Sequence, residues 1–185
     1  MRSNGSTDRA PRTAPVLVLG LGNTLLSDDG FGPFVLDELA RQFGDWQGQV
    51  EFLDGGTQGL TLLGCIAGRA ALVLLDALAT GKAPGTVSVL QESQLDDVGA
   101  RRASSAHDAN AGELLAVAAL LGQLPERVFL VGVEPQNLGT GLGLSESARN
   151  ALPDAVSLAQ AVIEEVLRNL AGTPGGQESV ALSRP

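Results

Sequence analysis

Four aspartates and the only histidine of this chain stand where apolar runs give way to polar loops: Asp28, Asp29, Asp54, Asp76 and His107. A carboxylate at the end of an apolar strand needs a partner or solvent, because an isolated buried charge is costly. Two carboxylates and one imidazole suit nickel, zinc, iron and related divalent ions. We therefore interpret Asp29, Asp76 and His107 as a candidate metal site, in which three protein ligands leave coordination positions open for a substrate.

Short apolar runs in front of these aspartates predict strands buried on both faces, at 16–19, 50–53 and 71–75. Apolar residues at helical spacing predict a helix after the first strand, with Pro33 in its first turn and Gly44 after its end. The pattern at 60–66 predicts a short second helix. A strand at 85–90 follows the third strand after about nine residues, which is too few for a helical crossover, so we expect it to run antiparallel.

The second half of the chain continues the alternation of strand and helix. The pattern predicts a helix at 109–122, a strand at 128–133 and one or two helices at 145–171, because Pro153 interrupts the last one. The predicted fold class is α/β: a three-layer sandwich with a twisted, mostly parallel five-stranded sheet, one antiparallel strand and helices on both faces. Ligands bind beyond the carboxyl ends of such strands, so the aspartates and His107 are expected along one edge.

The size and composition of the chain limit its partners. It has 185 residues, of which 44% are hydrophobic and 18% charged, enough for one core. We expect a single domain at 15–171 between flexible tails at 1–14 and 172–185, which are rich in Ser, Gly and Pro. A net charge of −9 without a basic run argues against nucleic acid.

The chain also lacks the patterns of membrane and secreted proteins. No apolar run approaches the roughly 20 residues that span a bilayer, and the polar N-terminus is no secretory signal. The lone Cys65 excludes an internal disulfide framework. We therefore expect a cytoplasmic protein without membrane insertion. The sequence shows no evident exposed apolar stripe, which is compatible with a monomer.

Structural roles compete with the chemical ones. Asp28 or Asp29 can cap the first helix, where a carboxylate gains about 0.3–1 kcal/mol from the helix dipole. Asp54 can form an Asx-turn into Gly55 and Gly56. His107 can be an ordinary surface or capping histidine. These alternatives stay open at this point.

Two other families of site fit less well. Gly20-Leu21-Gly22 resembles the start of a dinucleotide-binding motif, but Leu25 stands at the third glycine position. A phosphoacceptor receiver domain needs a lysine after the fifth strand, where this chain has Glu134. Its only lysine is Lys82.

The sequence resembles the hydrogenase maturation endopeptidases, and the resemblance covers roughly 16–170. Five segments carry it: VLVLGLGNTLLSDDGFGPFVLDEL, EFLDGGTQGLTLLG, ALVLLDAL, APGTVSVL and FLVGVEPQNLGTGLGLSESA. The ordered set, with G-x-G-N-x-L-x-x-D-D-x-x-G followed by D-G-G-T, is far more specific than a glycine motif alone.

The resemblance implies an endopeptidase that removes the C-terminal extension from the large-subunit precursor of a nickel–iron hydrogenase. It implies that Asp29, Asp76 and His107 recognise nickel carried by that substrate. Catalysis would involve Asp29, Asp76 and Asp54, with water activated either by the metal or by a carboxylate. The pocket would be shaped by Gly20, Gly22, Asn23, Gly55, Gly56 and Thr57. The alternative is an assembly factor that binds the nickel-loaded precursor without cutting it.

Overall fold

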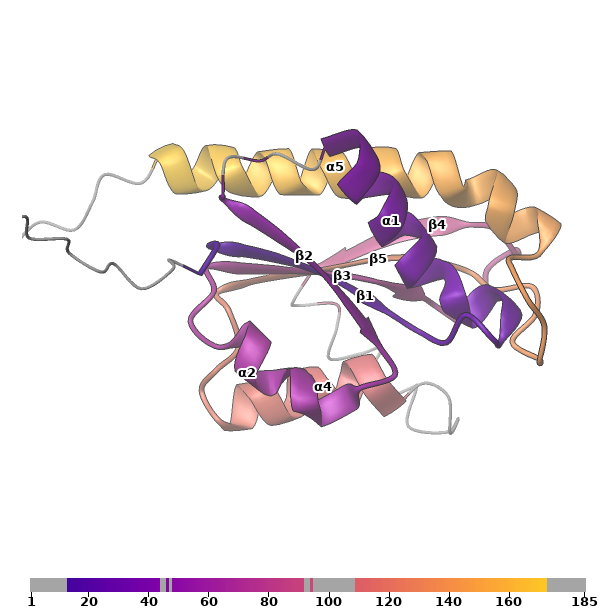
Figure 1. Ribbon diagram of the computed structural model, residues 1–185, viewed down its shortest axis with the longest axis horizontal. Helices are drawn as coiled ribbons and strands as arrows, with labels where there is room; N and C mark the ends of the chain where they lie inside the picture. Colours follow the sequence, from indigo (N-terminus) through magenta and orange to yellow (C-terminus); the bar gives the residue numbers. More distant parts are fainter. Residues whose placement is uncertain (1–12, 44–45, 47, 92–93, 95–108, 173–185) are drawn as a thin grey trace, which may run out of the picture.

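The computed structural model describes residues 13–43, 46, 48–91, 94 and 109–172. Within these residues the chain forms one five-stranded sheet in the order β2-β1-β3-β5-β4 (Figure 1). The strands are β1 (Val16–Leu21), β2 (Val50–Gly56), β3 (Ala71–Ala77), β4 (Val87–Gln91) and β5 (Arg127–Val133). The helices are α1 (Phe31–Phe43), α2 (Leu63–Ile66), α4 (Ala109–Leu120) and α5 (Glu146–Gly172), with 3-10 turns η1 (Ser27–Gly30) and η2 (Gly59–Leu62).

The sheet confirms the predicted fold class. Strands β2, β1, β3 and β5 are parallel, and β4 pairs antiparallel with β5 at one edge. All residues of β1 are buried, as expected for a central strand made of apolar residues and glycine. β1 and β2 extend past their predicted ends, because the ladder continues to the pair Leu21 and Gly56.

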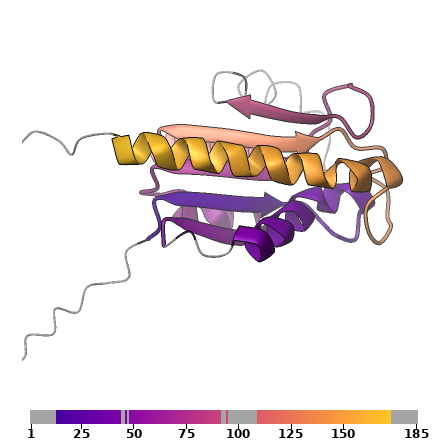
Figure 2. The same cartoon turned by 90° about the horizontal axis from the view of Figure 1, so that it is seen from above.

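Helices lie on both faces of the sheet (Figure 1), and each face packs an apolar layer of side chains against them. Helices α1 and α5 cover one face, and seen from above they lie side by side along the strands (Figure 2). Helices α2 and α4 cover the other face together with η2. Cys65 packs against this second layer as a half-buried apolar side chain.

The start of α1 sits directly on the ends of two strands. A Cβ atom at Gly32 would lie 2.1 Å from the carbonyl oxygen of Leu75 and 2.3 Å from that of Leu21. Only glycine permits this approach, since neither backbone oxygen can move out of the way. The contact fixes η1, and with it Asp28 and Asp29, against the carboxyl ends of β1 and β3.

The expectation that Pro153 interrupts the last helix is wrong. The helix α5 runs continuously over Glu146–Gly172 with Pro153 inside it. Buried residues on both sides of the proline, among them Ala151 and Ala155, belong to the same apolar layer. Their packing outweighs the roughly 3 kcal/mol that an interior proline costs. Among the described residues, no helix is long and apolar enough to cross a bilayer.

Candidate active site

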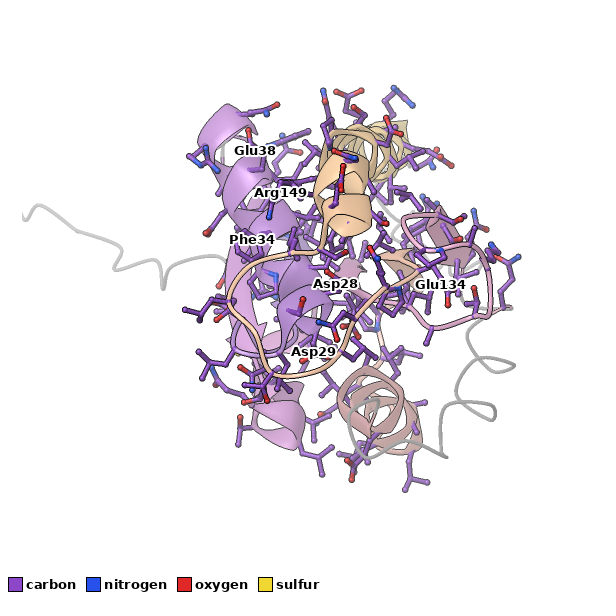
Figure 3. All side chains as sticks on the ribbon, turned by 90° about the vertical axis from the view of Figure 1, so that its right-hand side faces the viewer. Asp28, Asp29, Phe34, Glu38, Glu134 and Arg149 are labelled. Atoms are coloured by element: carbon purple, nitrogen blue, oxygen red, sulfur yellow. The ribbon has the colours of Figure 1, made fainter. Side chains whose placement is uncertain are left out.

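The carboxyl ends of β1, β2 and β3 form the edge that carries the predicted site, and Figure 3 looks onto this end of the molecule. Gly20 in β1 pairs with Asp54 in β2 and with Leu75 in β3. Asp76 follows Leu75 within β3. Three neighbouring strands therefore bring Asp54 and Asp76, which are distant in sequence, to one edge of the sheet.

The carboxylates of Asp54 and Asp76 point to opposite faces of the sheet. Leu75 belongs to the layer under α1 and α5, so the next residue, Asp76, faces the side of α2 and α4. Asp54 pairs with Gly20, whose Cβ position would face Leu36 of α1. Asp54 is exposed and Asp76 half-buried. These two carboxylates are thus placed for different tasks.

Asp29 is held by a compact turn between β1 and α1. Its Oδ2 accepts a hydrogen bond from the backbone N–H of Asn23 at 2.7 Å, and its own N–H donates to the carbonyl of Leu26 at 3.1 Å. Gly22, with φ 122°, brings the end of β1 against this turn, since a Cβ there would lie 1.8 Å from the carbonyl oxygen of Asp29. Gly22 and Asn23 therefore position Asp29.

Asp28, next to Asp29 in the chain, holds a loop in place rather than facing the candidate site. It is fully buried, and its carboxylate accepts backbone N–H groups far along the chain: Gln136 at 2.9 Å and Asn137 at 3.0 Å on Oδ2, and Ser145 at 2.7 Å on Oδ1. These three donors all lie in the loop between β5 and α5, and none lies in η1 or α1. The interpretation of Asp28 as a helix cap is wrong, because a fully buried carboxylate finds its donors in the loop between β5 and α5.

Backbone hydrogen bonds hold the same loop against the turn before α1. Ser27 donates to the carbonyl of Gly141 at 2.9 Å, and Gly141 donates to that of Leu25 at 3.0 Å. Asp28 also donates its N–H to the carbonyl of Asn137 at 3.0 Å. In Figure 3 the loop curves around the labelled Asp28 and Asp29.

Glu134 is a second buried carboxylate, and sequence reasoning assigned it no role in a site. It accepts the N–H and the hydroxyl of Thr80, both at 2.7 Å, and the N–H of Gly81 at 3.1 Å. Burial raises the pKa of Glu134, but these bonds and one from the N–H of Lys82 outweigh it, so the pKa lies below its ordinary value. Glu134 thereby fixes the loop that follows Asp76.

The other predicted pocket residues surround the end of β2. Asp54 forms the Asx-turn, because its Oδ1 accepts the N–H of Gly56 at 2.9 Å. Gly56 accepts the N–H of Gly22 at 3.0 Å, which ties β2 to β1. Gly55 faces leucine side chains of the core, and Thr57 is exposed directly after the strand.

His107 lies outside the described residues. Within the part of the chain that the structure describes, no group of three His, Cys, Asp or Glu side chains is arranged to hold a metal ion. The three-ligand set therefore stays a prediction.

Comparison with known proteins decides the family. The family model described as hydrogenase maturation protease matches residues 33–162. The chain belongs to the hydrogenase maturation protease family. It is 34% identical to the hydrogenase expression/formation protein HupM of Azotobacter chroococcum over 90% of this chain and 79% of that protein. It is 32% identical to the hydrogenase 2 maturation protease of Escherichia coli over 81% of this chain and 91% of that one.

A solved structure of this family has the same fold. The hydrogenase maturating endopeptidase HybD from Escherichia coli superposes with a TM-score of 0.72 at 32% identity, covering 81% of this chain and 92% of that one. The protein is therefore a peptidase, as the resemblance implied, and the dinucleotide-binding and receiver alternatives are set aside.

Proposed function

We propose that this hydrogenase maturation protease removes the C-terminal extension of the large-subunit precursor of a nickel–iron hydrogenase after nickel insertion. In this proposal it works in the cytoplasm and recognises the substrate's nickel through Asp29, Asp76 and His107. The family assignment supports processing of such a precursor. The placement of Asp29 and Asp76 supports the ligand set.

One observation carries the ligand set: the contact of Gly32 with the ends of β1 and β3. It brings the turn that contains Asp29 to the strand end that contains Asp76. Asp76 points to the face that α4 covers, and α4 begins at Ala109, two positions after His107 in the sequence. A histidine just before α4 is therefore well placed in the chain to complete the set.

The proposed chemistry is hydrolysis of one peptide bond. The two carboxylates and the imidazole bind the nickel that the precursor brings, and this holds the scissile bond in place. Water adds to the carbonyl carbon, the carbon–nitrogen bond breaks, and the leaving nitrogen takes a proton. The water is activated either by the metal or by a carboxylate as general base. Asp54, exposed at the same edge, orients the water or the peptide.

The test uses purified protein with a nickel-loaded precursor and, in parallel, a nickel-free one. We expect mass spectrometry to show loss of the C-terminal extension only from the loaded precursor. Asp29→Asn and Asp76→Asn should abolish the cut while the circular dichroism spectrum stays that of the wild type. A stable complex in which the precursor keeps its full mass would instead indicate the non-cleaving assembly factor.

A further inference from the structure

Two exposed leucines lie beside the turn that holds Asp29. Leu142 is 86% exposed and Leu25 is 59% exposed. A parallel bridge between Leu26 and Gly141 joins their two segments, so each leucine is one residue away from the bridge. We call this pair the leucine ridge. Leu25 belongs to the Asp29 turn itself, since its N–H donates to the side chain of Asn23, whose own N–H binds Asp29.

The ridge is held in place from beneath. The carboxylate of Asp28 binds both ends of the loop that carries Leu142, through Gln136 and Asn137 on one side and Ser145 on the other. A loop tied at both ends loses less conformational entropy when a partner binds, which favours affinity. Exposed apolar side chains on such a preorganised loop are therefore suited to contact a partner.

The side chains of the two segments that carry the leucine ridge indicate which kind of peptide can bind there. Neither 20–27 nor 135–145 contains an ionisable residue, although the chain as a whole has 12 basic and 21 acidic residues. Arg149 of α5 approaches the second segment at its end, where its guanidinium donates to the carbonyl of Leu144 at 2.9 Å. Two protruding leucines on segments without ionisable side chains match an uncharged peptide segment that carries an apolar side chain. Because the surface continues from the turn of Asp29, a segment bound there runs directly into the candidate site.

We propose that the leucine ridge is the docking surface for the uncharged apolar segment of the precursor next to its scissile bond. This inference rests on the proposed function. The ridge recognises the polypeptide, whereas the ligand set recognises its metal. Two separate contacts then explain how cleavage can require both the right sequence and a loaded metal.

The test changes each leucine to glutamine, which removes apolar surface without adding charge near Asp29. Leu25→Gln and Leu142→Gln should each raise KM for the nickel-loaded precursor about 10-fold, and the double variant about 100-fold, since each loses most of one buried leucine side chain. Leu120→Gln is the matched control, because Leu120 is 85% exposed at the far end of α4. It should keep the wild-type KM.

Each outcome bears on a separate claim. Wild-type KM in the double variant would overturn the ridge while leaving cleavage established. No cleavage by the wild-type protein would overturn the proposed function itself. Sedimentation of the wild type at increasing concentration tests the other occupant, a second copy of this chain. A dimer that the double variant abolishes would also overturn the ridge as a substrate surface.

Discussion

Replacing Asp28 by asparagine tests whether its buried carboxylate holds the loop between β5 and α5. Asparagine has one acceptor oxygen where aspartate has two. If the asparagine oxygen takes the place of Oδ2, it keeps the bonds from the N–H groups of Gln136 and Asn137. The amide NH₂ then takes the place of Oδ1 and faces the N–H of Ser145. The opposite orientation loses two bonds. The variant therefore loses at least one charge-assisted bond and leaves a donor without its acceptor, a cost of about 2–3 kcal/mol.

This cost has a measurable thermal signature. For a protein of this size each kcal/mol shifts Tm by about 2–4 °C, so Asp28→Asn should lower Tm by roughly 4–12 °C. Asp37→Asn is the matched control, because it makes the same change of side chain at an exposed position of α1. Its Tm should stay close to the wild type. A Tm for Asp28→Asn within about 2 °C of the wild type would refute the role assigned to Asp28.

Three further substitutions follow from the site. Glu134→Gln should cost about 1–3 kcal/mol at neutral pH, because a buried N–H loses its acceptor. Because the pKa of Glu134 is lowered in the folded protein, its contribution to stability is complete above the ordinary pKa of 4.5 and is lost as pH falls through the folded pKa. On acidification below pH 4.5, Tm of Glu134→Gln should therefore fall less than Tm of the wild type. The same dependence of Tm on pH in both proteins would contradict this. Gly22→Ala should displace Asp29 and reduce cleavage strongly. Gly64→Ala is its control and should cleave normally, because the added Cβ meets nothing within 4 Å. Equal activity of the two variants would count against the close contact between Gly22 and the carbonyl of Asp29. His107→Ala should weaken nickel binding in calorimetry at least about 10-fold, and unchanged affinity would remove His107 from the ligand set.

Much of the fold follows from local patterns that tertiary contacts reinforce. The run at 71–75 is apolar throughout because β3 is buried on both faces, and both its period and its length are visible in the sequence. The short gap before β4 predicted its antiparallel direction correctly, since the chain has no room to cross the sheet. The common edge of Asp54 and Asp76 followed from the rule that parallel strands end together.

The errors lie where distant contacts override a local signal. Pro153 normally ends a helix, but the packing of α5 along the whole sheet carries the helix through it. The strands predicted at 16–19 and 50–53 stop before Gly20 and Asp54, although pairing between β1 and β2 continues to Leu21 and Gly56. The donors of Asp28 lie 108 or more residues away, and no spacing rule links them to it. Glu134 likewise finds its partners more than 50 residues earlier.

The two adjacent aspartates differ because of the turn that carries them. In a 3-10 turn, successive side chains point about 120° apart, so neighbours cannot share an environment. Asp28 is turned into the protein, where backbone donors satisfy it, while Asp29 stays half-buried at the strand ends. Asp28 and Glu134 each fix a loop from inside, because their buried carboxylates accept backbone N–H groups of that loop. The segments on either side of this site, 20–27 and 135–145, contain no ionisable residue, which suits the apolar peptide proposed for the leucine ridge.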